Sequence, residues 1–220
     1  MASNKISDAV IRRLPGYYRY LHGLEEQGVE RISSQELGQR MGLTASQIRQ
    51  DINCFGALGQ QGYGYNVSEL RQYIAGVLGL DRRYRVVIVG AGNIGRAVAA
   101  YPSFQKRGMD VVALFDVDPE LVGQTLPNGA PILHAQGLKE YLGAHSCRVG
   151  IVATPGQVAQ EAANMLVEGG VRAIWNFAPV DLKVPSHVVV NNVHLTDSLY
   201  VLLYKLKEKD LELGVVEEGE

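Results

Sequence analysis

The sequence predicts an α/β protein in which a small helical module with a β-hairpin precedes a parallel sheet flanked by helices. Two short helices follow one another between residues 33 and 55, each introduced by a serine or threonine that can cap it. Glycines alternate with tyrosines in residues 56–67, which is typical of a hairpin. From residue 85 onward, short apolar runs alternate with helical stretches, as in a doubly wound parallel sheet.

The N-terminal module begins with a helical pattern, because apolar side chains recur every three or four positions over residues 5–27. Pro15 interrupts this pattern, so we expect a kink or a late start of the helix there. After the hairpin of residues 56–67, residues 68–79 form another amphipathic pattern, and the joint to the next domain follows at residues 81–84.

The two short helices carry clear start signals. Ser33–Glu36 and Thr44–Gln47 each have the spacing of a capping box, in which the first side chain accepts from the backbone three residues later. The first helix ends at Gly42, which provides a tight turn before the second. Helix, turn, helix and hairpin together predict a winged helix-turn-helix domain over residues 1–80.

The charge is unevenly distributed along the chain. Residues 1–85 carry a net charge of +3 and residues 86–220 a net charge of −5. This asymmetry favours, weakly, a nucleic-acid-binding module joined to a different domain. The first residues lack the apolar core of a signal peptide and no apolar run is long enough to cross a membrane, so we expect a cytoplasmic protein with no membrane partner.

The second part of the chain predicts a sheet domain over residues 85–195. Its strands should be nearly continuous apolar runs because both faces of a parallel sheet are covered. A final helix over residues 196–211 has several leucines on one face. The expected strands are RVVIV, DVVALFD, APILH, RVGIVA, VRAIWNF and HVVVNN.

A glycine-rich loop lies between the first strand and the first helix of this sheet. Gly90 permits a tight turn, Gly92 lets the backbone approach a pyrophosphate, and Gly95 lets the helix pack on the strand. The helix N-terminus offers unpaired N–H groups to the phosphates. Asp116 ends the next strand, 21 residues after Gly95, where it can bind ribose hydroxyls and would repel a 2′-phosphate. The pattern predicts a Rossmann-type domain that binds NAD(H) rather than NADP(H).

Two later strand ends belong to the same edge of the sheet. Thr154 and Pro155 follow one strand, where they could face the nicotinamide half of the ligand. Asn176 ends the next strand, and its alternative role is to shape the exit of that strand.

A dehydrogenase would need a substrate domain and usually a general acid or base near the nicotinamide. Only a short segment with one helix follows the last strand, and His194 is the only histidine near the carboxyl end of a strand. Cys54 and Cys147 match no metal or redox spacing. We therefore expect no catalytic residue, no metal site and no small-molecule substrate.

At this point the chain resembles the Rex family of redox-sensing transcriptional repressors, over nearly its whole length. The resemblance implies a homodimer with swapped C-terminal helices that binds a palindromic double-stranded DNA operator. NADH would close the dimer and release the DNA, whereas NAD+ would compete with NADH and leave DNA binding possible. The stretches that carry the resemblance are RRLPGYYRYL, SSQELGQRMGLTASQIRQD, CFGALGQQGYGYNV, VVIVGAGNIGRAVA, FDVDP, NFAPV and VPSHVVVNN.

The resemblance also implies roles for individual residues. Tyr101 should lie near the nicotinamide, and Arg19 matches an arginine that pairs across the dimer. The expected DNA contacts are Ser46, Gln47, Arg49 and Gln50 in the recognition helix and Gln60, Gln61 and Tyr63 in the wing. The expected dinucleotide contacts are Gly90, Ala91, Gly92, Asn93, Ile94, Gly95, Tyr101, Asp116, Val117, Thr154, Pro155 and Asn176.

The chain departs from the family pattern at three places. Gln50 stands where the family commonly has a lysine, and Gln60–Gln61 stand where the wing commonly has Lys-Arg. His194 replaces the usual acidic partner of the Arg19 position, with Asp197 one helical turn away. Fewer phosphate contacts lower affinity, so we expect weakened or altered operator binding. The alternatives are a Rex-like paralogue that acts through protein partners and, third, an NAD-dependent oxidoreductase.

Overall fold

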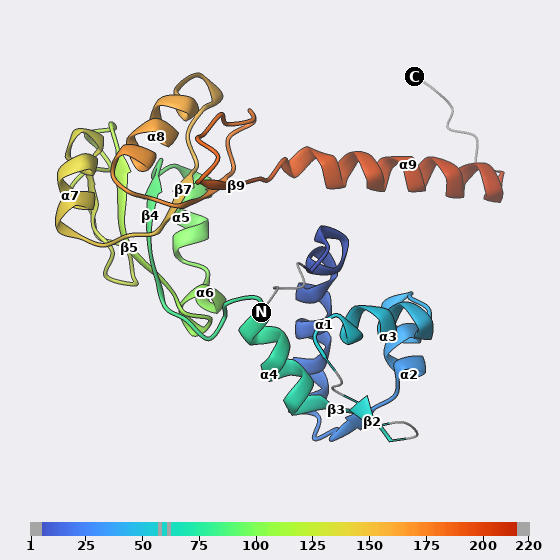
Figure 1. The fold of residues 1–220 in the computed structure, drawn as a ribbon. Helices are drawn as coiled ribbons and strands as arrows, with labels where there is room; N and C mark the ends of the chain where they lie inside the picture. Colours follow the sequence, from blue (N-terminus) through green and yellow to red (C-terminus); the bar gives the residue numbers. More distant parts are fainter. Residues whose placement is uncertain (1–5, 57–58, 61–62, 215–220) are drawn as a thin grey trace. The chain divides into compact units, whose positions relative to one another are not determined.

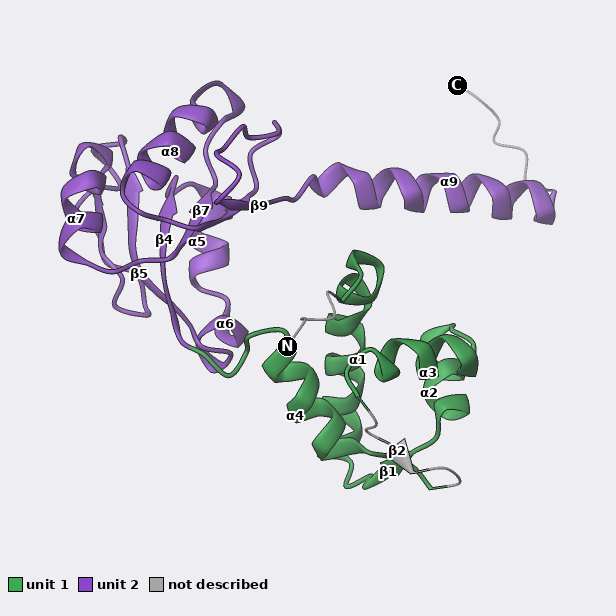
Figure 2. Ribbon diagram, in the orientation of Figure 1, with its two compact units in different colours: residues 1–82 green, residues 83–220 purple. Residues whose placement is uncertain are grey.

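A computed structural model describes residues 6–56, 59–60 and 63–214. The chain divides into two compact units, Met1–Arg82 and Arg83–Glu220 (Figure 2). Each unit has its own buried core, and each is described by itself.

The described residues of the first unit form four helices. Their first turns are capped by Ser7, Ser33, Thr44 and Asn66, each accepting from a backbone N–H. Both predicted cap residues of the helix-turn-helix are thus confirmed. The first helix runs unbroken through Pro15, so the expected late start was wrong; its buried apolar face stabilises it despite the lost hydrogen bond. The helices are α1 (Asp8–Glu26), α2 (Ser34–Met41), α3 (Ala45–Asn53) and α4 (Val67–Val77) (Figure 1).

A small antiparallel sheet completes this unit. Strands β2 (Gly59–Gln60) and β3 (Gly64–Asn66) pair as the predicted hairpin, and β1 (Arg31–Ile32) adds a third strand on the other side of β3. The sequence analysis missed β1 because two residues are too short for a detectable alternation. The turn between α2 and α3 requires close packing, since a Cβ on Gly38 would lie 2.6 Å from the Leu43 carbonyl oxygen.

The second unit is built on a six-stranded parallel sheet with the order β6-β5-β4-β7-β8-β9. This is the doubly wound order. The chain adds β5 and β6 on one side of β4 and then β7, β8 and β9 on its other side, so the order of the strands reverses between β4 and β7. All six predicted strands are confirmed, with no end shifted by more than two residues. They are β4 (Tyr84–Val89), β5 (Met109–Asp116), β6 (Ile132–His134), β7 (Val149–Val152), β8 (Ala173–Asn176) and β9 (Val189–Asn192).

Helices cover both faces of this sheet. Buried side chains of α7 and α8 pack on one face, and those of α5 pack on the other. The helical segment after β6 begins as a 3₁₀ turn and continues as α7. The helices are α5 (Asn93–Ala99), α6 (Pro102–Lys106), η1 (Ala135–Gly137), α7 (Leu138–Ala144), α8 (Gly156–Glu168) and α9 (Leu195–Leu213).

The last helix, α9, has 19 residues and buries none of them within the described chain. Leu199, Leu202, Leu203 and Leu206 are each about half exposed or more. An apolar helix of this kind needs a partner surface. Among the described residues, no helix is both long enough and apolar enough to span a membrane.

Candidate functional site

A cavity of about 390 Å³ opens where strands β4, β5 and β7 end. This edge is the position at which doubly wound sheets bind nucleotides. The walls are mostly apolar, and the polar side chains on the lining are those of Asp116, Gln136, Thr154 and Glu161. The apolar and glycine lining residues are Val89, Gly90, Gly92, Phe115, Val117, Ala135, Ala153, Pro155, Val158, Ala162 and Met165.

The glycine loop is shaped by close backbone contacts. Gly90 has a φ of +100°, and a Cβ there would lie 2.5 Å from the Ala153 carbonyl oxygen. A Cβ on Gly95 would overlap the carbonyl oxygen of Gly90. Gly92, in contrast, has no atom within 4 Å of its would-be Cβ and lines the cavity. The first and third glycines therefore fix the loop, and the second leaves room for a ligand.

Asp116 lies at the end of β5 and holds the glycine loop against that strand. Its Oδ2 accepts from the Ala91 N–H at 2.5 Å. Its Oδ1 accepts from the Val117 and Asp118 N–H groups at 2.7 and 3.0 Å. A carboxylate has about four lone-pair sites, so the half-buried Asp116 retains acceptor capacity toward the cavity.

The side chains around this cavity fit a dinucleotide. The Thr154 hydroxyl is buried without a partner in the described structure, and Thr154 lines the cavity. A buried hydroxyl without a hydrogen bond costs free energy, so a ligand atom at that point would be stabilising. Open space over Gly92, an acceptor at Asp116 and apolar walls supply the other requirements of such a site.

Several residues expected at the nucleotide lie off the cavity lining. Ala91 is fully buried, Asn93 bonds to Arg96, and Ile94 is partly exposed on α5. Tyr101 is 55% exposed at the start of α6, with its ring centroid 5.0 Å from that of Phe104.

Asn176 is completely buried, its described side-chain hydrogen bonds are made within the protein, and it is not among the residues that line the cavity. Its Nδ2 donates to the Val180 carbonyl at 2.7 Å and to the Asn192 side chain at 2.9 Å. Its Oδ1 accepts from the Ala178 N–H at 3.0 Å. Its geometry matches the alternative role, in which the side chain shapes the exit of β8.

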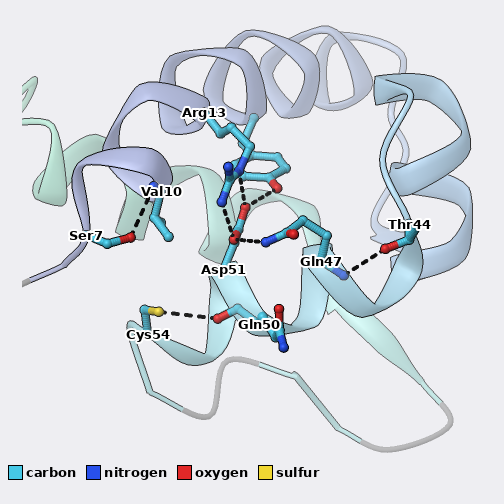
Figure 3. A network of polar contacts seen from close by, with 9 residues as sticks. Ser7, Val10, Arg13, Thr44, Gln47, Gln50, Asp51 and Cys54 are labelled. Atoms are coloured by element: carbon cyan, nitrogen blue, oxygen red, sulfur yellow. Dashed lines mark hydrogen bonds and ion pairs between the residues drawn. The ribbon is translucent and has the colours of Figure 1, made fainter.

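A second constellation centres on Asp51 of the recognition helix α3 (Figure 3). Arg13 of α1 donates to both oxygens of the Asp51 carboxylate, at 2.6 and 2.8 Å. The Tyr17 hydroxyl donates to Oδ2 at 2.7 Å, and the Gln47 amide nitrogen donates to Oδ1 at 2.8 Å. Asp51 is only 1% exposed, so this network joins α1 to α3 through a buried charge.

The network shifts the pKa values of its members in opposite directions. Burial by itself raises the pKa of Asp51, but the hydrogen bonds from Arg13, Tyr17 and Gln47 outweigh it, so the pKa is lowered. Burial, followed by the bond to Asp51, raises the pKa of Tyr17. Asp51 is therefore ionised and Tyr17 is a neutral donor at neutral pH.

The other expected DNA contacts on α3 are exposed. Ser46, Arg49 and Gln50 lie on the solvent side of the helix, and the Arg49 guanidinium bonds to the Ser34 hydroxyl at 3.1 Å. The Cys54 thiol donates to the Gln50 carbonyl at 3.3 Å. The exposed side of α3 thus carries polar side chains that a nucleic acid could contact.

The hairpin presents one expected contact and one that the sequence analysis missed. Tyr63 is 70% exposed, and its carbonyl accepts from the Arg31 guanidinium at 3.3 Å. The same guanidinium lies 5.8 Å from the centre of the Tyr63 ring. Gln60 belongs to β2, whereas Gln61 lies outside the described residues. Arg31 therefore places a positive charge beside Tyr63 of the hairpin.

The expected switch residues lie in different units. Arg19 is exposed on α1, and His194 and Asp197 lie at the start of α9. The His194 ring bonds to Asp181 at 3.2 Å rather than to Asp197. Asp197 is exposed in the first turn of α9.

In the part of the chain that the structure describes, few reactive side chains lie at the cavity or in clusters. No histidine, lysine, tyrosine or cysteine side chain is among the residues that line the cavity. Cys147 is buried, and burial raises its pKa, whereas Cys54 is exposed. The described residues form no group of three or more His, Cys, Asp or Glu side chains that could hold a metal ion.

Comparison with known proteins assigns the family. The model described as "Putative DNA-binding protein N-terminus" matches residues 5–53, and the "CoA binding domain" model matches residues 81–180. The redox-sensing transcriptional repressor Rex of Clostridium beijerinckii is 53% identical over 205 residues, covering 93% of this chain and 97% of that relative. The chain belongs to the Rex family. A Rex protein of Caldicellulosiruptor saccharolyticus is 51% identical and covers 94% of both chains.

Solved Rex-family structures agree in fold. RSP, a Rex-family repressor, matches with a TM-score of 0.87 at 47% identity, over 94% of this chain and 96% of RSP. RSP in complex with β-NAD+ and operator DNA matches with a TM-score of 0.88 at 46% identity, over 98% and 99% of the two chains. RSP in complex with β-NADH gives 0.87 at 44% identity, over 96% and 99%. The winged-helix and Rossmann-type architecture is thus confirmed, and the relatives are transcriptional repressors.

Some functional residues were invisible in the sequence. Arg13 and Tyr17 are one helical turn apart on α1, but their acceptor lies more than 30 positions away. Arg31 precedes a buried isoleucine in a strand of two residues. The i, i+4 pair on α1 was the one available signal, because it places a donor pair on a single helix face.

Proposed function

We propose that this Rex-family chain is a redox-sensing transcriptional repressor that acts as a homodimer. The dimer binds a palindromic operator in double-stranded DNA, and binding of NADH releases it. NAD+ competes with NADH at the same site and permits DNA binding. The requirement is that NADH binds the closed form more tightly than the DNA-bound form.

One observation carries this proposal: a capped recognition helix and a nucleotide-type cavity occur in the same chain. In the cavity, Gly92 leaves open space, and Asp116 and the Thr154 hydroxyl offer polar contacts. The complexes of RSP with NAD+ and operator DNA and with NADH support the same assignment, since RSP shares the fold over nearly the whole chain.

The proposal gives each part of the chain a role. Residues 1–80 form the DNA-binding domain, 85–195 bind NAD(H), and 196–211 form the swapped dimerisation helix. The exposed leucines of α9 support the last role, because they have no cover within the described chain. Arg19 and the His194–Asp197 segment are proposed to report the state of the cofactor across the dimer. The proposed base and phosphate contacts are Ser46, Gln47, Arg49, Gln50, Gln60, Gln61 and Tyr63.

We also propose that the dinucleotide is an effector and not a reactant. Hydride transfer usually requires an acid or base next to the substrate. Among the described residues, no histidine, lysine, tyrosine or cysteine side chain lines the cavity, and the Asp116 carboxylate already accepts three backbone hydrogen bonds. The repressor relatives support this assignment.

The test uses the full-length protein and a duplex that it selects from a random double-stranded pool. Fluorescence anisotropy of this labelled duplex is measured while NADH, NAD+, NADPH or coenzyme A is added. NADH should lower the DNA affinity, and NADPH should not, because Asp116 repels a 2′-phosphate. Coenzyme A is the control for the family model named after it.

The outcomes separate the alternatives. DNA binding that saturating NADH leaves unchanged would contradict the proposed switch. Binding of NADH without selection of any duplex would favour the paralogue that acts through protein partners. Steady oxidation of NADH with small carbonyl compounds would favour an oxidoreductase.

A further inference from the structure

The tether between Gln47 and Asp51 fixes the direction of the glutamine amide. An ionised carboxylate has no hydrogen and can only accept. The group of Gln47 that lies 2.8 Å from Asp51 Oδ1 must therefore be its nitrogen, and Figure 3 shows this nitrogen turned toward Asp51. The amide oxygen then occupies the other branch of the side chain.

The tether is held firmly by its surroundings. Asp51 is 1% exposed and also receives two bonds from Arg13 and one from Tyr17. These three bonds fix the carboxylate to α1, so it cannot rotate to follow Gln47. The backbone N–H of Gln47 is fixed too, because it donates to the capping hydroxyl of Thr44 at 3.1 Å.

Gln47 lies where a recognition helix meets base edges. It is the third residue of α3, between the exposed Ser46 and the exposed Gln50 face, and it is itself partly exposed. Residues near the N-terminus of a recognition helix contact the major groove. A glutamine that is free to turn can present either its oxygen or its nitrogen, and the groove offers partners for both.

We propose that Gln47 reads one base of each operator half-site through its amide oxygen, which accepts a hydrogen bond from an exocyclic amino group. Adenine N6 and cytosine N4 supply such donors in the major groove, whereas guanine O6 and thymine O4 are acceptors. Asp51 is the positioning residue, because it holds the nitrogen away from the DNA. This inference rests on the proposed DNA-binding function.

The experiment first identifies the half-site by selection with the full-length protein. Each adenine of the half-site is then replaced in turn by purine, and each cytosine by 2-pyrimidinone, so that only the amino group is lost. At one position, affinity for the analogue should fall about fivefold with the natural protein, as expected for one hydrogen bond. The identity of the sensitive base tells adenine from cytosine.

Two variants of α3 connect this effect to the side chain. In Gln47→Ala, the ratio between the natural base and the analogue should fall to about one at that position. In the matched control Gln50→Ala, which is on the same helix but outside the Asp51 network, the ratio should stay near five even if the overall affinity falls. Unchanged NADH affinity in both variants shows that the rest of the protein is intact.

Asp51→Asn tests the positioning role. Its amide gives Gln47 a partner that can donate as well as accept, so the glutamine can turn and the preference for amino over keto bases at that position should shrink. Mere destabilisation would lower affinity for all bases alike. The proposal is overturned if the amino-group effect persists in Gln47→Ala, or if no amino group matters. If the protein selects no sequence at all, the proposed DNA-binding function fails together with this proposal. If it selects an operator but the Gln47 results differ from those expected, this proposal alone fails.

Discussion

Replacing Asp51 with asparagine removes the charge that joins α1 to α3. The carboxylate accepts four hydrogen bonds, and an asparagine keeps one acceptor oxygen, so about half of these donors lose their partner. Each hydrogen bond to a charged group contributes about 1.5–3 kcal/mol. The Arg13 side chain is 29% exposed and can recruit water, and the Tyr17 hydroxyl can turn to accept. We therefore expect a loss of about 3 kcal/mol, which is large against a total stability of about 5–15 kcal/mol.

The effect should be confined to the first unit, and the chain offers an internal reference. Trp175 is the only tryptophan and lies in β8 of the second unit, so its fluorescence reports that unit alone. Hydrogen exchange of the α3 amides reports the first unit. A loss of about 3 kcal/mol should speed the slowest α3 exchange by about a hundredfold and lower the melting temperature of a domain this size by about 12–24 °C. The denaturation curve of Trp175 should stay in place.

Glu36→Gln is the matched control in the same unit. It also turns an acid into its amide, but the Glu36–Arg40 pair is separated by 3.7 Å with both side chains about half exposed. Exposed pairs of this kind contribute little, so α3 exchange should not change measurably. Equal exchange in Asp51→Asn and Glu36→Gln would refute the reasoning that the buried network stabilises α3.

The pH dependence follows from the lowered pKa of Asp51. A carboxyl with a pKa below its unfolded value of about 3.9 contributes its stabilisation above that value and loses it as the pH falls through the folded pKa. The difference in stability between the natural chain and Asp51→Asn should therefore be constant near neutral pH and shrink below about pH 4. A difference that is equally large at pH 3 and pH 7 would contradict the assignment of the charge.

Three further predictions concern the nucleotide cavity, the wing and the last helix. Thr154→Val should weaken NADH binding about threefold to tenfold by calorimetry without lowering stability, because the hydroxyl has no partner in the described structure; unchanged affinity would remove Thr154 from the site. Arg31→Gln should reduce the slope of log affinity against log salt by about 0.9 per chain, and an unchanged slope would show that Arg31 meets no phosphate. Leu199→Glu together with Leu203→Glu should convert dimers to monomers in light scattering, and a persistent dimer would place the interface elsewhere.

Local signals in the sequence were enough for most of the fold. Ser33 and Thr44 mark helix starts because a cap depends on atoms only three residues apart. Gly90 and Gly95 mark the nucleotide loop because their spacing between a strand and a helix is visible in the sequence, although the atom that Gly90 must avoid belongs to the distant Ala153. The strands of the sheet were predicted because burial on both faces leaves long apolar runs.

What the sequence could not provide were contacts made by distant segments. Asn176 is a polar residue at the end of a strand, which suggested a ligand contact. Its three hydrogen bonds depend on loop and strand positions that only the folded chain brings together. Gln47 fits a capping box, in which its side chain would reach back to the backbone, and the structure directs it to Asp51 instead. The hydrogen bond to the charged Asp51 carboxylate determines the orientation of the side chain, since charge-assisted hydrogen bonds are stronger than neutral ones.

The glutamines expected at DNA-facing positions have a different consequence for affinity than for specificity. Gln50 and Gln60 are uncharged and form no ion pair with a phosphate, and phosphate contacts carry no sequence information directly. Arg31 and Arg49 keep positive charge on the hairpin and on α3, so the electrostatic contribution is reduced and not abolished. The partly buried bond between Asp51 and Gln47 involves no phosphate and does not depend on these glutamines. A repressor built in this way should bind its operator more weakly than a more basic relative at the same salt concentration while still discriminating among bases at the Gln47 position.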